Sequence, residues 1–383
     1  MMRPTHMPFH RVRRARTWYY KIVKLCSCHR ALSYRKERCS VTEVRDTLFF
    51  IMRPEFIPVR AALFRRTRSF FHTAGYLEVD TPTLSPRLIP EAHIDPFETH
   101  FHDPYHEGRS IPLYLVPSPE VHLKPLLGQV GGRLFQLGHC FRNAESVGEQ
   151  HNPEFTMLEY YECPADERTL LTRTQAFIRS LQGDTILAQM AQRSGADRLF
   201  SATAIELRVA EAFERYTGIE ITDSESTFVD RCRQFDGSLP EGATWNEAFD
   251  YLMAAHIEPQ LPRDRPVFLT HYPWQAEVLA RRADELSCRR RWELYIGGRE
   301  IANCFAEEQH PARVSEFMHR QNEYRRDRGA AVIRPAVEVA GALRDSEPCA
   351  GCALGFDRLL MILCGVNSIE GVIFSPLHDS IRP

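Results

Sequence analysis

The segment 135–161 constrains the fold most, because it predicts two strands joined by a long charged loop. Apolar residues alternate along 135–141, and a second strand-like run covers 155–161. The two runs together predict an antiparallel hairpin. A long loop inside a compact domain usually serves a function. Arg142 stands where this loop begins, and a guanidinium held at such a point suits a phosphate.

Three stretches, in the same order along the chain, resemble the lysyl form of the class II aminoacyl-tRNA synthetases. FRN and HNPEFTMLEYY in 141–161 resemble motif 2, and ALGFDRL in 353–359 resembles motif 3. Between them, WELYIGGREIAN in 292–303 resembles the strand that carries the metal and amino-acid ligands. The resemblance spans roughly residues 55 to 380. It implies an α+β fold in which helices flank an antiparallel sheet.

The start of the matched region resembles motif 1, which builds the dimer interface in that family. Residues 59–73 have the period of an amphipathic helix, Gly75 follows as its stop, and 76–82 is a strand that ends at a proline. The resemblance therefore implies a homodimer. Other patterns predict helices at 121–127 and 313–328, and strands at 96–101, 113–116, 267–273, 292–296, 300–305 and 352–355.

The composition is that of an ordinary globular chain, with 383 residues of which 43% are hydrophobic and 26% charged. No apolar run approaches the ~20 residues that span a bilayer, so we expect no membrane partner. Eleven cysteines are scattered without the spacing of a disulfide framework. Reduced thiols in a cytoplasm are therefore expected.

Charge divides the chain unequally. Residues 1–51 carry 12 Lys or Arg and three acids, although the net charge of the whole chain is −2. A basic tail can bind nucleic acid, but we interpret this one as a disordered extension or a start-site artefact, because Met52 precedes the first recognisable helix. Residues 52–383 then form the catalytic domain, with a helical insertion at about 164–266. The intact mass of the native protein tests the late start.

The resemblance implies that a carboxylate attacks the α-phosphate of ATP. That reaction depends on positioning and charge neutralisation and needs no nucleophilic side chain. Arg142 and Arg358 are the predicted catalytic cations, because each stands among apolar neighbours. The resemblance places Phe155 on the adenine. It implies further nucleotide contacts from Asn143, Glu145, His151, Asn152, Glu300, Ile301 and Gly355.

The motif 2 loop departs from the family pattern at one point. The family usually has FRNE, whereas Ala144 follows FRN here and the acid Glu145 comes one position later. Either a shift of the loop restores the acid, or the adenine contact is weaker.

A divalent cation is predicted at two acids on either side of a tight turn. Glu293 and Glu300 flank Gly297-Gly298, so their side chains are expected to face each other across the two strands. Facing acids repel each other, and a bound cation removes the repulsion. Magnesium prefers one or two carboxylates together with substrate phosphates. The alternative is a pair of exposed acids on an edge hairpin.

The amino-acid pocket is expected to be acidic. Glu120 stands at a predicted helix start, where the helix dipole favours a carboxylate, and the resemblance assigns it to an α-ammonium. Glu307 is the predicted partner of a side-chain ammonium, because a buried carboxylate discriminates against ligands that lack the amine. The predicted pocket also includes Ser118, Pro119, Glu159, Tyr161 and Asn303.

The chain ahead of motif 1 lacks the alternating strands of an anticodon-binding barrel. The sequence therefore most resembles the elongation factor P lysine ligases, which transfer lysine or β-lysine to a lysine of that factor, and tRNA is not the expected partner. Ala302 and Ala353, where lysyl-tRNA synthetases usually have Gly, favour this interpretation and predict a reshaped pocket. Cys304 is a further departure from a usual Gly.

Two alternatives stay open. One is a truncated lysyl-tRNA synthetase-like enzyme that acylates tRNA. The other is a non-catalytic paralogue, which would be expected to lack Arg142, Glu300 or Arg358, although all three are present.

Overall fold

A computed structural model describes residues 52–106, 108–144, 149–222, 224–283, 287–374 and 376. The fold described here lies within the unit Phe50–Pro383. The predictions made for residues 1–51 and for Glu145 lie outside the described residues.

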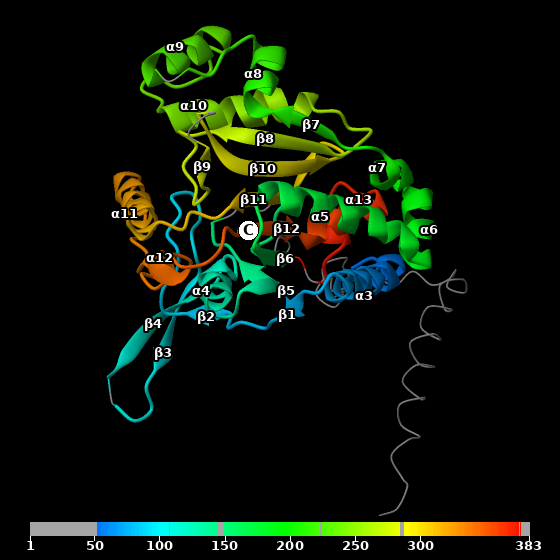
Figure 1. The fold of residues 1–383 in the computed structure, drawn as a ribbon, viewed down its shortest axis with the longest axis horizontal. Helices are drawn as coiled ribbons and strands as arrows, with labels where there is room; N and C mark the ends of the chain where they lie inside the picture. Colours follow the sequence, from blue (N-terminus) through cyan, green and yellow to red (C-terminus); the bar gives the residue numbers. More distant parts are fainter. Residues whose placement is uncertain are drawn as a thin grey trace, which may run out of the picture. The chain divides into compact units, whose positions relative to one another are not determined.

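Among the described residues, nine strands form one large sheet (Figure 1). Its neighbours pair antiparallel, except for the parallel pairs β1–β5 and β7–β8. The predicted α+β fold is confirmed. In order across the sheet, the strands are β1 (Leu77–Glu78), β5 (Gly132–Phe141), β6 (Glu154–Cys163), β12 (Ala350–Gly355), β11 (Arg299–Ala306), β10 (Cys288–Ile296), β8 (Val267–Pro273) and β7 (Ile205–Arg208), with β9 (Arg282–Ala283) beside β10.

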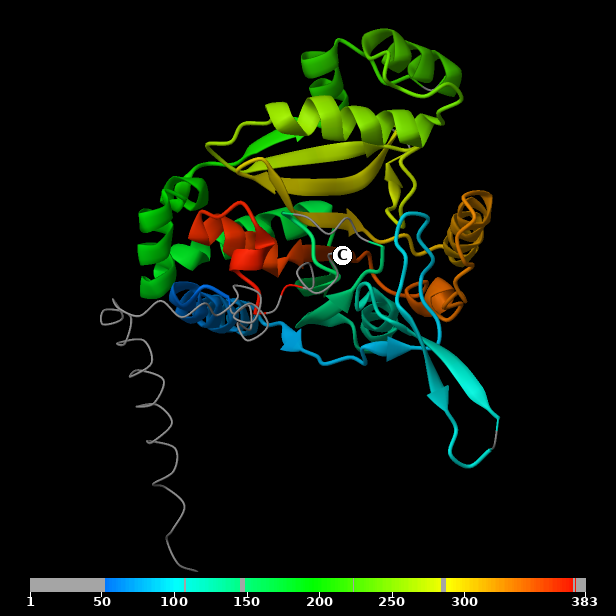
Figure 2. The ribbon, with the colours of Figure 1, turned by 180° about the vertical axis from the view of Figure 1, so that it is seen from behind.

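One face of the sheet carries four helices that share a single apolar core with β5, β6, β12, β11 and β10 (Figures 1 and 2). In the first of these helices Val59, Ala62, Leu63 and Phe71 are buried, and Phe70 is partly buried. The helices are α3 (Ile57–Thr73), α5 (Glu167–Ser180), α6 (Thr185–Ser194) and α13 (Phe356–Cys364).

The other face of β5 and β6 is covered by the helix α4 (Glu120–Val130). Tyr160 packs in the core beneath α3 and α5, whereas Tyr161 packs with Leu123 and Leu127 of α4. Neighbouring residues of a strand point to opposite faces, so α4 lies on the opposite side from α3. Beside it are α11 (Pro311–Asp327), α12 (Val339–Ala342) and a small sheet of β2 (Leu84–Ser85), β4 (Ser110–Leu115) and β3 (Glu98–His102).

Residues 164–266 differ from the purely helical insertion that was expected. Their first helix, α5, packs in the main core, and β7 extends the main sheet beside β8. Only the later helices form a core of their own against β8, seen at the top of Figure 1. These are α8 (Val209–Thr217), α9 (Glu225–Phe235) and α10 (Trp245–Leu252), while α7 (Asp197–Ser201) precedes β7.

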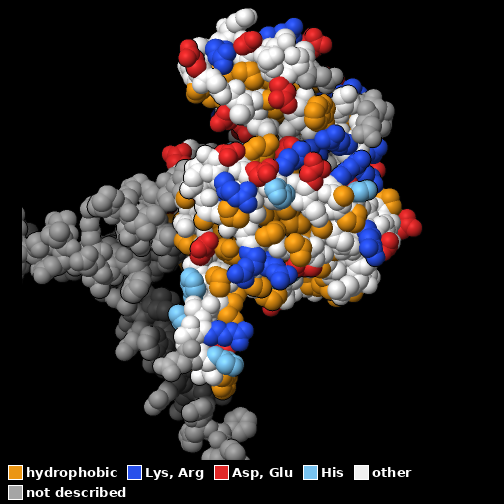
Figure 3. Space-filling view, turned by 90° about the vertical axis from the view of Figure 1, so that its left-hand side faces the viewer, with side chains coloured by type: hydrophobic (Ala, Val, Ile, Leu, Met, Phe, Trp, Pro, Cys, Tyr) orange, Lys and Arg blue, Asp and Glu red, His pale blue; other side chains and the backbone are white. Residues whose placement is uncertain are grey.

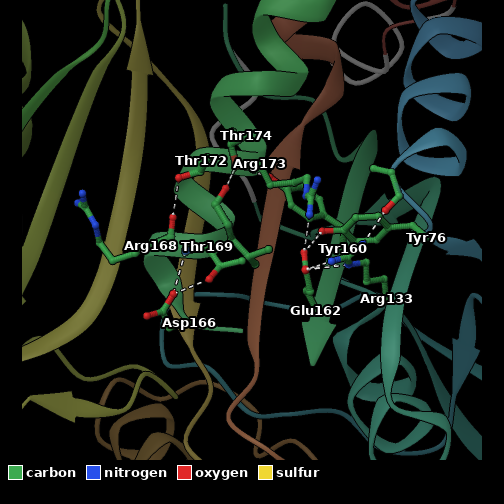
Figure 4. Close-up of polar contacts among 12 residues, drawn as sticks. Tyr76, Arg133, Tyr160, Glu162, Asp166, Arg168, Thr169, Thr172, Arg173 and Thr174 are labelled. Carbon is green, nitrogen blue, oxygen red and sulfur yellow. Dashed lines mark hydrogen bonds and ion pairs between the residues drawn. The ribbon is translucent and has the colours of Figure 1, made fainter. Parts of the chain in front are cut away.

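The motif 1 strand is shorter than predicted, since only Leu77 and Glu78 pair with β5. Its connection to the sheet depends on a buried acid (Figure 4). Glu162, at the end of β6, accepts a hydrogen bond from Tyr76 at 2.8 Å and pairs with Arg133 at 2.7 Å. Arg173 of α5 approaches the same carboxylate at 3.4 Å. One carboxylate therefore joins the end of α3, the hairpin and α5.

The β3–β4 hairpin projects from the body and carries several histidines (Figures 1 and 3). In Figure 3 the histidine side chains are spread along this projection and do not gather at one point. Within the described ranges, no group of three or more His, Cys, Asp or Glu side chains could hold a metal ion. None of the described helices has both the length and the apolar character needed to cross a membrane.

Candidate active site

Three elements, α4, β6 and β11, bring acidic side chains together on the α4 side of the sheet. Glu120 begins α4, Glu159 lies on β6, and Glu307 directly follows β11. Glu159 is buried and accepts hydrogen bonds from Ser118 at 2.6 Å and from Tyr161 at 2.7 Å. The structure thus unites five of the predicted pocket residues, with Pro119 as the N-cap of α4.

Burial makes the carboxyl groups of Glu159 and Glu307 harder to ionise. Burial, followed by the charge of Glu120, raises the pKa of Glu159 to about 8. Burial also raises the pKa of Glu307 to about 7, against the opposing effect of Lys124. Such shifts collect at functional sites, and a cationic ligand would reverse them by favouring the charged forms.

Glu307 has an acceptor that the protein leaves unused. Its side chain is 1% exposed, and its Oε1 has no hydrogen-bond donor among the described residues. Leaving a buried acceptor unpaired costs about 1–3 kcal/mol. A donor supplied by a ligand would recover that free energy.

Gly351 on β12 makes this arrangement possible. It pairs with Tyr161 across the strands, and a Cβ built on it would lie 2.3 Å from the Tyr161 ring and 2.8 Å from Glu307 Oε1. The ring and the carboxylate thus fill the space that any larger residue would need.

Gly351→Ala is therefore expected to lower the free energy of unfolding by about 1–3 kcal/mol, because the added methyl group overpacks a closed site. Denaturant unfolding measures the change. The control is Gly341→Ala in α12, where an added Cβ meets nothing within 4 Å and alanine suits the helix better than glycine. Equal stabilities of the two variants would contradict the expectation.

The predicted nucleotide residues meet at the start of α13. Arg358 donates to the Glu300 carboxylate at 3.2 Å, and its other terminal nitrogen lies 2.8 Å from His151 Nε2. A guanidinium has only donors, so this imidazole nitrogen accepts. Arg142 lies over the Phe155 ring, 5.3 Å from its centroid. The structure thus brings Arg358, Glu300 and His151 together, and separately pairs Arg142 with Phe155.

The remaining nucleotide predictions fare differently. Asn143 forms a bridge with Asp95 through its backbone, and buried Asn152 donates to the Glu154 carbonyl at 2.6 Å. The side chain of Ile301 lies in the helix-covered core, so only its backbone could contact a ligand, and its role toward the nucleotide stays a prediction. Gly355 is the N-cap of α13, where an added Cβ would make only ordinary contact, so its role toward a ligand stays a prediction.

The facing of the two predicted metal ligands is wrong. Next to the turn, Tyr295 and not Glu293 pairs with Glu300, as a count outward from the two turn residues requires. A register shift between Leu294 and Tyr295 then places Glu293 opposite Asn303. The Gly297-Gly298 turn itself is confirmed, with both φ angles positive.

The carboxylates still fit a magnesium ion that is also bound by phosphates. Glu293 and Tyr295 share a face, since the Tyr295 hydroxyl donates to Glu293 at 2.8 Å, and Glu300 stands opposite Tyr295. Tyr272 and Arg291 engage Glu293 as well. Glu300, whose side chain is 40% exposed, would be the better-placed ligand of the two. Asn303 accepts from Arg291 at 3.1 Å.

Two residues expected to alter the pocket lie elsewhere. Ala302 and Cys304 point to the helix-covered face and belong to its core, whereas Ala353 faces Glu159 and Asn303 across the strands. Of the two alanines, only Ala353 therefore lies on the pocket side of the sheet.

Three charged residues of the site were not anticipated. Lys124 of α4 lies between Glu120 and Glu307, Glu91 approaches the pocket from a loop, and Glu258 accepts from Tyr295 at 3.2 Å. Burial raises the pKa of Glu91 and of Glu258 to about 7. One signal was present in the sequence: Lys124 is the only lysine after residue 36.

Comparison with known proteins places this geometry in a family. The family model described as tRNA synthetases class II (D, K and N) matches residues 52–379. The chain belongs to this class II synthetase family. Membership accounts for the order of the three motifs and for the long antiparallel sheet with α4 and α13 on its two sides.

Curated relatives cover the same region. The elongation factor P--(R)-beta-lysine ligase of Hamiltonella defensa is 32% identical, and the proteins of that name from Pasteurella multocida and Yersinia enterocolitica are 33% and 32% identical. Each alignment covers 83% of this chain and 94% of the relative. Within the class II synthetase family, the chain therefore groups with these ligases.

Proposed function

We propose that this chain is an ATP-dependent ligase that activates lysine or β-lysine as an aminoacyl-adenylate and transfers it to a lysine side chain of elongation factor P. The names of its relatives support the acceptor. The arrangement of the site supports the activation step.

The observation that carries the proposal is the surplus of acid in the pocket. Glu120, Glu159 and Glu307 converge there, whereas one internal ammonium, that of Lys124, offsets them. The unpaired Glu307 Oε1 lies within this group. Most buried acceptors of a folded protein are paired, so an unpaired oxygen among these acids supports a ligand at this place. A diamino acid supplies two ammonium groups, which suits an excess of carboxylates.

The proposed reaction has two steps. An oxygen of the lysine carboxylate attacks the α-phosphorus of ATP, and pyrophosphate leaves. The neutral ε-amine of the acceptor lysine then attacks the carbonyl carbon, the bond to AMP breaks, and the amine loses a proton. Arg142 and Arg358 would neutralise phosphoryl charge, and catalysis would consist of positioning. Magnesium, when bound, would add charge neutralisation at the phosphates, with Glu300 as the ligand and Glu293 beside it.

Two further features belong to the proposal. The motif 1 elements α3 and β1 would form a homodimer interface. The reaction would take place in the cytoplasm, where a translation factor works, and the eight described cysteines are all free thiols, as that compartment favours.

The affinity for lysine is expected to fall as the pH is lowered from about 8 to about 6. A diammonium ligand binds ionised carboxylates, and the raised pKa values of Glu159, about 8, and Glu307, about 7, mean that both take up protons over this range. Isothermal titration calorimetry in buffers of different ionisation enthalpy measures both the affinity and the protons released. A flat pH profile without proton release would count against the pocket. ATP binding is the internal control.

The acceptor is tested by mass spectrometry. The protein is incubated with magnesium, ATP and each lysine isomer, with elongation factor P or tRNA as the acceptor. We expect elongation factor P to gain the mass of one lysyl group, on a lysine. Acylated tRNA with unchanged elongation factor P would overturn the proposal.

A further inference from the structure

Lys124 is the one lysine of the described chain. Residues 52–383 contain 35 arginines and only this lysine. At exposed positions the two residues replace each other readily, but a compact ammonium with three donors differs from a planar guanidinium wherever space is limited. Residues 52–383 have arginine at each of their other Lys or Arg positions. The single lysine therefore indicates a site that requires an ammonium group.

The position of Lys124 explains that requirement. Its side chain is 2% exposed, and its Nζ lies 2.9 Å from Glu120 Oε2 and 3.0 Å from Glu307 Oε2. The same atom is 5.4 Å from the centroid of the Phe305 ring. The ammonium thus joins the first turn of α4 to the segment that follows β11.

The neighbouring carboxylates keep the Lys124 ammonium in its charged form. Burial lowers the pKa of Lys124, but Glu120 and Glu307 raise it, and the net result lies above the usual value. An isolated buried ammonium is costly and is tolerated only when it is well paired. The ionisable groups around Lys124 are Glu91, Glu120, Glu159, Tyr161, Glu307 and Cys349, and the nearby cations are Arg142 and Arg291.

The helix that carries Lys124 is fixed in place. A Cβ built on Gly128, one turn further along α4, would lie 1.9 Å from the carbonyl oxygen of Ala342. This close approach to α12 prevents α4 from sliding. The ammonium of Lys124 is therefore held at a set point between the two carboxylates.

Each carboxylate gives Lys124 only one oxygen. Oε2 of Glu307 is taken, while Oε1 has no donor among the described residues. Glu120 gives its Oε2, and its side chain is 17% exposed. The paired oxygens fix the orientation of both carboxylates, and the rest of each group is left for a ligand.

We propose that Lys124 is a positioning residue that ties Glu120 to Glu307, so that the two carboxylates stand at a fixed separation to receive the two ammonium groups of a diamino acid. This inference rests on the proposed function and deepens it, since it names the group that sets the spacing of the pocket. Lys124 itself touches no reacting atom.

Lysine-dependent ATP–pyrophosphate exchange with Lys124→Met and Lys124→Arg tests the inference. Both variants are expected to raise the KM for lysine about tenfold or more, because truncating or misfitting one partner of a buried charge pair is costly. The KM for ATP should stay within about twofold. In Lys124→Met, the loss of the cation should also move the pH dependence of kcat/KM for lysine to higher pH, since Glu307 then ionises less readily.

The control is Gln129→Met, an exposed position on the same helix, which should match the wild type. An unchanged or lower KM for lysine in Lys124→Met would overturn the inference, and a lower value would mean that Lys124 competes with the substrate. Full recovery in Lys124→Arg would also overturn it, because charge alone would then suffice. Should the methionine variant fail to fold, the arginine variant carries the same comparison. Absence of exchange in the wild type would refute the proposed function instead.

Discussion

Arg358→Met is expected to lower lysine-dependent pyrophosphate exchange about a thousandfold. Removing one preorganised group that stabilises developing charge typically costs about 10²–10³ in kcat, and phosphoryl transfer depends on such groups almost entirely. Arg358 is already positioned, since Glu300 and His151 hold its two terminal nitrogens. The loss should appear in kcat, because the side chain is proposed to act on charge that grows in the transition state.

The matched control is Arg344→Met. Arg344 is an exposed arginine whose ion pair with Asp345 lies on the surface, and such pairs contribute little. Steady-state exchange at saturating ATP and lysine compares the two variants. Equal activity of Arg358→Met and Arg344→Met would remove Arg358 from the catalytic step.

Glu307→Gln is expected to lower kcat/KM for lysine by about two to three orders of magnitude. The amide is nearly isosteric, but it leaves Lys124 with one carboxylate fewer and gives the ligand a neutral acceptor. Breaking a buried charge pair from one side costs about 3–5 kcal/mol, part of which is lost as substrate affinity. The effect should fall on the KM for lysine, while the KM for ATP stays unchanged.

Glu308→Gln provides the neighbouring control. Glu308 turns to Arg313 at 3.4 Å and accepts from the His310 backbone at 3.0 Å, so it serves the start of α11 and not the pocket. The two substituted residues are neighbours in the chain, but Glu307 lies in the pocket and Glu308 lies at the start of α11. If both raise the KM for lysine equally, the pocket assignment of Glu307 is wrong.

The elements with a regular period could be predicted from the sequence. The hairpin of β5 and β6, the helix α3 and the turn at Gly297-Gly298 all follow from local patterns, and each is present. Residues on one face of β6, such as Glu159 and Tyr161, could therefore be assigned to one pocket.

What the sequence could not show depends on contacts between distant segments. The strand β7 joins the sheet through parallel pairing with β8, a pairing about 60 residues away that no local period reveals. Glu293 was expected opposite Glu300, but Tyr295 takes that place, and a register shift that no local pattern reveals puts Glu293 opposite Asn303. Glu307 was recognised, but its partner Lys124 was not, since nothing local to α4 shows which carboxylate its side chain reaches.

The ion pair between Arg60 and Asp357 is another contact between distant segments that the sequence does not show. Arg60 of α3 donates to Asp357 at the start of α13 and to Thr156 at 2.8 Å, contacts that the helical period of α3 does not reveal. Asp357 also accepts from the Thr156 backbone. Asp357, the residue before Arg358, is therefore held by α3 and β6. These contacts help to explain how Arg358 becomes a fixed part of the site.

The most direct test of the account is ATP–pyrophosphate exchange with the purified protein and magnesium. Labelled pyrophosphate should return to ATP when lysine or β-lysine is present, and should not return with amino acids that lack a second amine. If no lysine isomer supports exchange, the pocket described here does not activate a diamino acid, and the account is contradicted.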